Sequence, residues 1–380
     1  AQDPNWPSMT SMIRTAALKY IHGIHKPIGP CRRSYATASN AKVLIFSAQP
    51  YVRQFMQAPM ESAFPGRVAF TDARCSTETA ALAEGCDAIC NFVNDDCDAE
   101  VVEILKKSGV RLVLQRCMGF DRVDLAACAA AGIRVARVPA YSPHSVAEHV
   151  VGLIMTLNRK LHLAYGRTRY GNFTLSGLTG MDLHGKTVGI VGTGQLGQLV
   201  AQKLSGFEVK YLCYDVHEVE AMKTKFGAKY VPLDELFASC DIVTLHLPLM
   251  KATRHLVNAD LIAKAKPGMI LINAARGGLV KTSDLLAGLR SCQIGYYGMD
   301  VYEGEEALFF TDFSALDMKD RMAQWDTNMG QLRSLPNVLM TPHSAFLTHE
   351  ALEDIANTTI QNFKEYIDGK ELTNEVKMTK

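Results

Sequence analysis

Short apolar runs alternate with segments of helical spacing through the first part of the chain. The spacing of residues 100–107 predicts a helix that ends at Gly109. The apolar runs predict strands at 42–47, 68–71, 88–93 and 111–114. Strands that alternate with helices over short connections predict a parallel sheet covered by helices. We therefore expect an open α/β unit that begins near Ala41.

A second α/β unit is predicted after a turn-rich crossing at 138–143. One long helix is expected over 145–163, because its apolar residues follow helical spacing behind a proline turn. Six apolar runs then predict strands at 188–191, before Asp215, and at 241–247, 269–273, 294–301 and 337–340. This is the strand count of a complete dinucleotide-binding sheet.

The first strand of this second unit leads into a glycine motif, Gly192-Thr193-Gly194-Gln195-Leu196-Gly197, which opens a helix. In such a motif the first glycine permits a tight turn, the second admits a pyrophosphate and the third lets helix and strand pack closely. Asp215 ends the next apolar run, 18 residues after Gly197. Its carboxylate can accept hydrogen bonds from ribose hydroxyls and would repel a 2′-phosphate. The sequence therefore predicts NAD as the cofactor, in preference to NADP.

Composition excludes several other classes of protein. The 380 residues are 48% hydrophobic with a net charge of +1, which fits about two globular domains. Charges are dispersed, and no apolar stretch reaches the roughly 18 residues needed to span a bilayer, so neither a nucleic-acid nor a membrane partner is expected. The ten cysteines include no CxxC pair and lie mostly in apolar runs, so we expect buried reduced thiols and no metal site.

The first forty residues have the composition of a transit peptide. No acidic residue occurs between Asp3 and Glu61, while basic residues are spread among Ser, Thr and Ala. Arg33-Ser34-Tyr35-Ala36 is similar to a mitochondrial presequence cleavage site, with a chloroplast address or a plain basic tail as alternatives. Residues 1–8 resemble the remnant of an expression tag. We expect residues 1–40 to lie outside the fold and the mature protein to enter the mitochondrial matrix.

Two side chains beyond the glycine motif are candidates for a reactive site at the edge of the second sheet. Arg276 follows the strand at 269–273, at the sheet edge where parallel folds bind ligands, and its guanidinium can hold a carboxylate. His343 follows the last strand and a Thr-Pro turn, so its ring can project toward a cleft. By contrast, His149 on a helix and His246 in a strand are expected to be packed or capping residues.

Several motifs in one order resemble the D-isomer-specific 2-hydroxyacid dehydrogenases, and within them the fermentative D-lactate branch. Besides the glycine motif they are Gly119-Phe120-Asp121 with the run 123–125, the run 138–142 with the run 147–149, the run 273–277, the run 298–303 and Thr341-Pro342-His343. The resemblance covers about residue 41 to the C-terminus. It implies NADH-dependent, reversible reduction of pyruvate to D-lactate. It also implies that His343 is the proton donor, Glu305 its acidic partner and Arg276 the group that binds the substrate carboxylate.

The resemblance implies further contacts. Asp300 is implied to orient the nicotinamide carboxamide, and a small substrate pocket is implied at Met118, Gly119, Tyr141 and Phe346. The remaining cofactor contacts implied are Gln195, Leu196, Leu247, Pro248, Thr253, Ala274 and Ala275. The segment 307–325, which starts with ALFFTDFS, is similar to the lactate branch.

The implied architecture is two open parallel-sheet domains with the active site in the cleft between them. A flavodoxin-like substrate domain, 41–141 plus 342–380, is interrupted by a Rossmann domain, 142–341. Closure about the two crossings is expected to bring His343 and Arg276 together over the substrate. The alternatives are a related enzyme acting on glyoxylate, hydroxypyruvate or a longer keto acid, and a corepressor-like NADH sensor. A homodimer or homotetramer is expected.

Overall fold

The computed structural model describes residues 40–377, so the predicted presequence lies outside the described residues. Residues 41–380 form one compact unit that contains two parallel sheets. The first has the strand order β2-β1-β3-β4-β5 and the second the order β12-β11-β10-β9-β6-β7-β8. Two parallel α/β sheets confirm the predicted fold class. Among residues 40–377, no helix combines the length and apolar character that crossing a bilayer requires.

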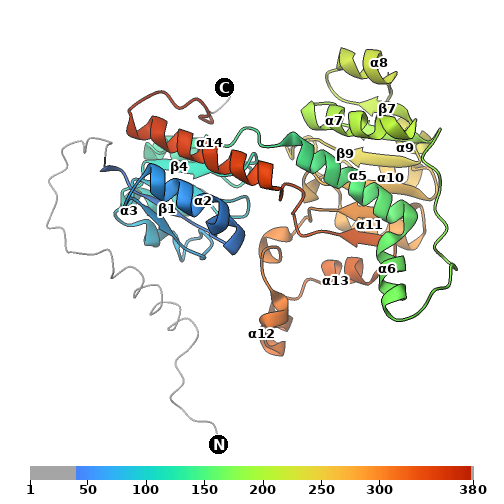
Figure 1. Cartoon of the computed structure of the whole chain (residues 1–380), viewed down its shortest axis with the longest axis horizontal. Helices are drawn as coiled ribbons and strands as arrows, with labels where there is room; N and C mark the ends of the chain where they lie inside the picture. Colours follow the sequence, from blue (N-terminus) through green and yellow to red (C-terminus); the bar gives the residue numbers. More distant parts are fainter. Residues whose placement is uncertain (1–39, 378–380) are drawn as a thin grey trace, which may run out of the picture. The chain divides into compact units, whose positions relative to one another are not determined.

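The first sheet and its helices are called here the first lobe (Figure 1). Its strands are β1 (Val43–Ile45), β2 (Val68–Phe70), β3 (Ala88–Asn91), β4 (Leu112–Gln115) and β5 (Arg134–Arg137). Its helices are α2 (Pro50–Ala63), η2 (Ala80–Ala83), α3 (Ala99–Ser108), α4 (Leu125–Ala131) and the C-terminal α14 (His349–Ile367). The side chain of Asp98 caps α3 by accepting the Val101 N–H at 3.0 Å, and Gly109 ends the helix with φ 97°.

Helix α14 joins the first lobe although it follows the second sheet in sequence. Figure 1 shows α14 beside α2, and the rings of Phe64 and Phe363 meet edge to face at 4.8 Å between centroids. Phe363 is fully buried with the β1 and β3 side chains. This packing is what the discontinuous domain requires, while the exact bounds 41–141, 342–380 and 142–341 stay predictions.

The second sheet and its helices are called the second lobe. Its strands are β6 (Thr187–Val191), β7 (Lys210–Tyr214), β8 (Lys229–Tyr230), β9 (Ile242–Leu245), β10 (Met269–Asn273), β11 (Ile294–Met299) and β12 (Val338–Met340). Its α-helices are α5 (Pro143–Arg159), α6 (Leu161–Arg169), α7 (Gln195–Leu204), α8 (Glu220–Phe226), α9 (Leu233–Ser239), α10 (Ala259–Lys264), α11 (Thr282–Arg290), α12 (Met318–Ala323) and α13 (Thr327–Ser334). Short 3₁₀ turns are η3 (Ser205–Phe207), η4 (Gly277–Leu279), η5 (Glu305–Ala307) and η6 (Phe313–Ala315).

The single helix expected over 145–163 is wrong, because Lys160 divides it into α5 and α6. Lys160 has φ 51°, in the left-handed region, and its buried ammonium donates to the Thr179 carbonyl and lies 5.0 Å from the centre of the Tyr296 ring. These contacts come from distant segments and end α5 where local spacing would have continued it.

The cysteines agree with the expectation of buried thiols. All nine within residues 40–377 are free, and seven of them are buried. Burial raises the pKa of the Cys90 thiol to about 11 and that of Cys117 to about 12. Of these nine cysteines, Cys292 is exposed.

Candidate active site

The glycine motif forms the turn between β6 and α7, and Gly192 and Gly197 meet the steric demands predicted for them. Gly192 has φ 97°, and a Cβ there would lie 2.8 Å from the His246 carbonyl oxygen. At Gly197 a Cβ would overlap the Gly192 carbonyl oxygen, so only glycine lets α7 pack this closely on the turn. Gly194, the N-cap of α7, instead has open space around its α-carbon. The free N–H groups at the start of α7 therefore remain accessible to an anion.

Asp215 lies one residue beyond β7 and faces the glycine turn. Its carboxylate accepts the Thr193 N–H at 2.6 Å and the His217 N–H at 3.2 Å. Burial works against the charged form, but these N–H groups outweigh it and hold the pKa of Asp215 below its ordinary value. Val216 beside it is 83% exposed and carries no cation for a 2′-phosphate. The turn and the acid together fit the adenosine half of a non-phosphorylated dinucleotide.

The other predicted cofactor positions lie after β9 and β10 or in the first turn of α7. Leu247 and Pro248 follow β9, and Ala274 and Ala275 follow β10, while Gln195 and Leu196 form the first turn of α7. Thr253 differs from these, because its hydroxyl donates to the Pro248 carbonyl at 2.7 Å and accepts the Met250 N–H at 2.8 Å. In this structure Thr253 closes the turn after Pro248.

Arg276 extends from the second lobe to the first. Its Nε donates to the Asp121 carboxylate at 2.8 Å, and its Nη1 donates to its neighbour's carbonyl, that of Ala275, at 2.8 Å. A Cβ on Gly119 would overlap Nη2, so the guanidinium lies directly against the Gly119 backbone. Burial disfavours the charged form, but Asp121 offsets this and the pKa of Arg276 is raised. Asp121, which sequence reasoning gave no role, fixes the orientation of this cation.

His343 and Glu305 form a close pair. His343 Nδ1 lies 2.7 Å from Glu305 Oε1, and the two side chains are only 14% and 12% exposed. The second oxygen of Glu305 accepts the Tyr302 N–H at 2.9 Å. His343 has φ 52°, a left-handed conformation at the turn that follows β12. Of the three neighbouring glutamates, the structure pairs the predicted one with the imidazole.

Glu303, which precedes Glu305 in the same loop, has other partners. Glu303 contacts His255 and accepts the Thr282 N–H and hydroxyl. Burial would raise its pKa, but these hydrogen bonds outweigh that effect and lower the pKa of Glu303. Glu303 is therefore fully engaged away from His343.

Asp300 is buried one residue beyond β11 and binds residues on both sides of His343. Its carboxylate accepts the Ser344 N–H at 2.8 Å, the Ala345 N–H at 2.9 Å and the Thr341 hydroxyl at 2.6 Å. His149 was expected to pack or cap a helix, but its Nε2 lies 2.9 Å from the Thr341 hydroxyl and 3.5 Å from Asp300. This network connects α5 with the second crossing. The predicted nicotinamide contact of Asp300 stays a prediction.

The other histidine, His246, was placed in a strand and instead lies one residue beyond the end of β9. Its Nε2 is 2.9 Å from the Thr244 hydroxyl. Burial lowers the pKa of His246 to about 3, so its ring is neutral near pH 7. A neutral ring at this pH has no proton ready to give to a substrate, in agreement with the choice of His343.

Four aromatic side chains form one cluster that reaches His343 through Phe310. The ring centroids of Tyr141 and Phe346 are 6.2 Å apart, so two of the residues predicted to line the substrate pocket lie together. Sequence reasoning missed Phe92, 5.6 Å from Phe346, and Phe310, 6.2 Å from the His343 ring. Phe310 belongs to the ALFF run, which was noticed only as a family feature. Burial raises the pKa of Tyr141 and keeps its hydroxyl neutral.

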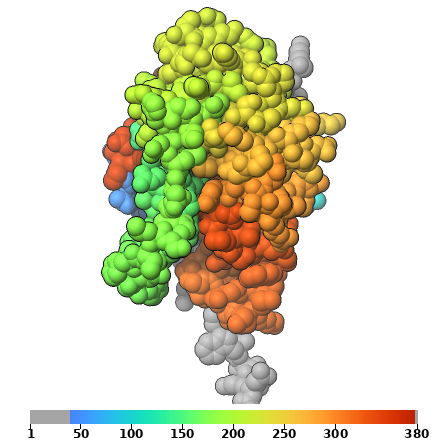
Figure 2. Space-filling view, turned by 90° about the vertical axis from the view of Figure 1, so that its right-hand side faces the viewer, coloured from blue at the N-terminus to red at the C-terminus, as the bar shows by residue number. Residues whose placement is uncertain are grey.

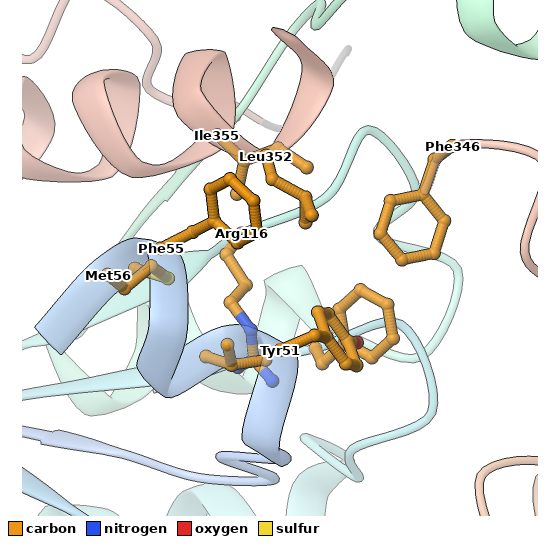
Figure 3. Close-up of a pocket in the computed structure, with 9 residues that line it drawn as sticks. Tyr51, Phe55, Met56, Arg116, Phe346, Leu352 and Ile355 are labelled. Carbon is orange, nitrogen blue, oxygen red and sulfur yellow. The ribbon is translucent and has the colours of Figure 1, made fainter. Parts of the chain in front are cut away.

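Behind Phe346 lies a small apolar pocket within the first lobe (Figure 3). Its lining includes Tyr51, Phe55, Arg116, Leu352 and Ile355. The buried Arg116 guanidinium donates to the Ser47 carbonyl at 2.9 Å and lies over the Phe92 ring. Arg116 thus packs against Phe92, one of the four aromatic side chains in the cluster that reaches His343. The predicted pocket residue Met118 is 41% exposed, and its carbonyl accepts from Arg137 at 2.8 Å.

Comparisons with known proteins agree with this arrangement. Residues 151–345 match the model of the D-isomer-specific 2-hydroxyacid dehydrogenase NAD-binding domain, so this region binds NAD. The chain is 44% identical to 2-hydroxyacid dehydrogenase homolog 1 of Schizosaccharomyces pombe, over 86% of this chain and 96% of that protein. It is 41% identical to the D-lactate dehydrogenase of Escherichia coli, over 88% and 99%. A solved structure of the pyruvate reductase of Chlamydomonas reinhardtii superposes with a TM-score of 0.83 at 48% identity, over 89% of this chain and all of that one.

Proposed function

This chain belongs to the D-isomer-specific 2-hydroxyacid dehydrogenases, and on that premise we propose that it reduces pyruvate to D-lactate with NADH, reversibly. The observation that carries the proposal is the His343–Glu305 pair, 2.7 Å apart and sheltered from solvent. An imidazole beside a carboxylate is favoured in its protonated form, which is the form a keto-acid reductase needs. The names of two similar proteins, the D-lactate dehydrogenase of Escherichia coli and the pyruvate reductase of Chlamydomonas reinhardtii, support the same reaction.

The reaction assigns a separate task to each side chain. Bound NADH supplies the hydride that reaches the keto carbon. Arg276 binds the substrate carboxylate, with Asp121 on its Nε holding the guanidinium plane in place. Glu305 occupies Nδ1 of His343, which leaves Nε2 to give its proton to the oxygen that becomes the hydroxyl. In the direction of lactate oxidation, the neutral ring takes that proton back.

The four clustered aromatic side chains favour a small substrate over a large one. Phe92, Tyr141, Phe310 and Phe346 belong to one apolar cluster beside His343. Bulky rings of this kind leave space for a methyl group more readily than for a long side chain. Glyoxylate, hydroxypyruvate and longer keto acids remain the alternatives within the family.

The test is NADH oxidation by the purified chain with pyruvate, followed by absorbance and repeated with NADPH. We expect pyruvate to give a higher kcat/KM than glyoxylate, hydroxypyruvate or 2-ketoisocaproate, and NADH to be preferred because Asp215 disfavours a 2′-phosphate. A higher kcat/KM for one of the other acids would replace pyruvate as the substrate. Equal use of NADPH would overturn the role given to Asp215.

We also propose that the chain forms a homodimer, with a homotetramer as the alternative. Large apolar side chains on α6 and the loop after it are exposed, namely Tyr165 at 64%, Tyr170 at 92%, Phe173 at 75% and Leu175 at 81%. Figure 2 shows this green segment as a ridge on the surface. Apolar groups gathered in this way support association. Light scattering of the protein as it elutes from a size-exclusion column is expected to give twice the monomer mass of 41.7 kDa. A monomer mass would contradict the proposal.

For localisation, the basic composition of residues 1–40 supports import into the mitochondrial matrix. We expect the mature protein to begin near Ala36, and a chain that lacks residues 1–40 to keep its activity and thermal stability. N-terminal sequencing of protein from its native source measures this directly. An intact N-terminus would contradict import, and fractionation with chloroplasts would favour the alternative address.

A further inference from the structure

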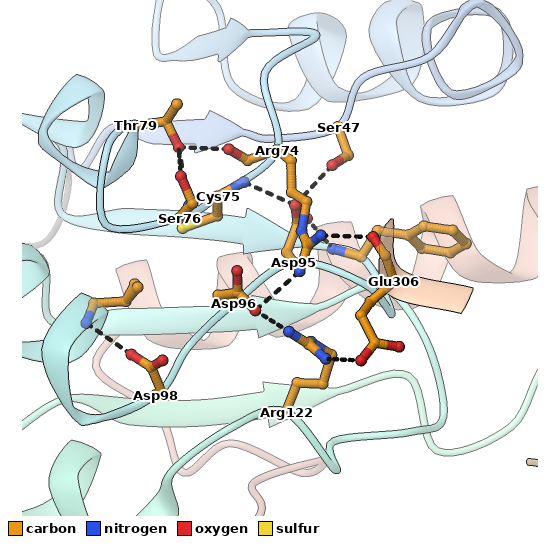
Figure 4. A network of polar contacts seen from close by, with 12 residues as sticks. Ser47, Arg74, Cys75, Ser76, Thr79, Asp95, Asp96, Asp98, Arg122 and Glu306 are labelled. Carbon is orange, nitrogen blue, oxygen red and sulfur yellow. Dashed lines mark hydrogen bonds and ion pairs between the residues drawn. The ribbon is translucent and has the colours of Figure 1, made fainter. Parts of the chain in front are cut away.

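Two arginines of the first lobe contact the 3₁₀ turn that carries Glu305 (Figure 4). Arg74, in the loop after β2, donates from Nη1 to the Glu306 backbone carbonyl at 2.7 Å. Arg122, between β4 and α4, places Nη1 3.9 Å from the Glu306 carboxylate. One arginine thus holds the main chain of η5 and the other its acidic side chain.

Asp96 holds both arginines in place from within the first lobe. Its Oδ1 accepts from Arg74 Nη2 at 2.9 Å and also from Arg122 Nη2. Asp96 is 25% exposed, and the two arginines are 35% and 33% exposed. One carboxylate shared by two arginines fixes both long side chains with a smaller loss of conformational entropy than two separate surface ion pairs would. We call Arg74, Asp96, Arg122 and Glu306 the interlobe clamp.

The clamp acts on a turn whose geometry determines the position of Glu305. Glu305 and Glu306 are adjacent in η5, so the Glu306 carbonyl held by Arg74 is one residue from the Glu305 side chain. Within the second lobe, the Tyr302 N–H holds one oxygen of Glu305, and its other oxygen faces His343. A shift of η5 therefore changes the Glu305–His343 distance directly.

We propose that Arg74 and Arg122 are positioning residues that hold Glu305 against His343 through Glu306 when the two lobes are in contact. The inference rests on the proposed function, because it assigns a role in the same proton transfer. It also makes proton transfer depend on lobe contact: the imidazolium has its full anionic support only while the first lobe holds η5.

The direction of the pH effect separates positioning from simple charge. If Arg122 acted only as a nearby cation, its removal would favour the protonated imidazole, and pyruvate reduction would persist to higher pH. If Arg122 holds Glu305 in place, its removal weakens the anionic support, and reduction fails at lower pH. The two explanations therefore predict shifts of opposite sign. The other charged or titratable groups of the site keep their identity in these variants, namely Glu305, Glu306, Asp300, His149 and Arg276.

The experiment measures kcat and KM for pyruvate reduction against pH in the full chain. Arg122→Gln and Arg74→Met are each expected to move the alkaline limb of kcat to lower pH by roughly half a unit. We expect kcat at neutral pH to fall by about two- to five-fold, the range for ion pairs this exposed. Glu305→Gln gives the full size of the shift, since it removes the anionic partner outright. Arg74→Lys keeps a donor and a charge, and should recover part of the loss.

Arg53→Met is the matched control. Arg53 is an arginine of the same lobe that pairs with Asp72 at 2.9 Å, and Asp72 lies in that lobe as well. Its removal takes away one cation of the first lobe without releasing η5. The pH profile of this variant should match that of the parent.

An unchanged limb in Arg122→Gln and Arg74→Met, or a limb moved to higher pH, overturns the proposal. If Arg122→Gln does not fold, Arg74→Met tests the same claim, because Arg122 then stays on Asp96. A parent chain that does not reduce pyruvate defeats the proposed function instead. In that case the titration of the His343 ring, followed by NMR with ¹³C-labelled histidine and assigned with His343→Gln, still reports whether the arginine variants shift it downward.

Discussion

Replacing His343 with glutamine is expected to lower kcat for pyruvate reduction by roughly 10²–10⁴-fold, the usual contribution of a positioned acid. Glutamine retains a hydrogen-bonding side chain but cannot deliver a proton at neutral pH. NADH binding should be largely preserved, because the glycine turn and Asp215 lie on other strands of the second lobe. The measurements are steady-state kcat with pyruvate and NADH binding by fluorescence titration.

His184→Gln is the control for the loss of an imidazole. His184 also pairs with a glutamate, Glu208, at 3.1 Å, but both side chains are about three-quarters exposed. Its replacement should leave kcat unchanged. A His343→Gln enzyme with near-parental kcat would contradict the assignment and direct attention to His149, which the structure places beside Asp300.

The strands that the sequence revealed are those with continuous apolar runs. The run 269–273 matches β10 at both ends, because every residue of that strand is buried. The pattern missed β5, where Arg134 and Arg137 flank two buried residues, and β8, which has only two residues. Arg134 pairs with Glu375 at 2.7 Å. That partner lies 241 residues away in the chain, so no local pattern indicates it.

The same limit applies to the site. Arg276, Glu305 and His343 were found because each follows a strand or belongs to a motif of fixed spacing, and the structure places Glu305 on His343 as predicted. Asp121 and Phe92 were missed, because their contacts with Arg276 and Phe346 join segments far apart in sequence. An aspartate in a loop has many possible partners, and only the folded chain selects one.

The glycine turn was predictable in detail for a different reason. Its demands are steric and local, since Gly192 needs a positive φ and Gly197 has no space for a Cβ. Gly119, by contrast, does not have a positive φ, and a Cβ there would meet the end of the Arg276 side chain from the other lobe. Only the structure reveals that second kind of constraint, and it leads to a prediction about Arg276.

Arg276→Lys is expected to lower kcat/KM for pyruvate by roughly 10- to 100-fold, mostly through a higher KM. A charged hydrogen bond contributes about 1.5–3 kcal/mol, and lysine cannot reproduce the planar, two-pronged contact of a guanidinium with a carboxylate. It also loses the Nε–H that Asp121 holds at 2.8 Å. Steady-state kinetics over a range of pyruvate concentrations measures the change. Arg290→Lys, at the exposed last residue of α11 in the same lobe, should keep the parental KM.

Gly119→Ala tests the same contact from the other lobe. Its Cβ would overlap Arg276 Nη2, so the guanidinium must move off the Gly119 backbone and KM should rise in the same direction as in Arg276→Lys. Combining the two substitutions should raise KM by less than the product of the single effects, because both remove one shared contact. Multiplicative effects would show that Gly119 and Arg276 act on the substrate separately. An unchanged KM in Arg276→Lys would remove Arg276 from the carboxylate site.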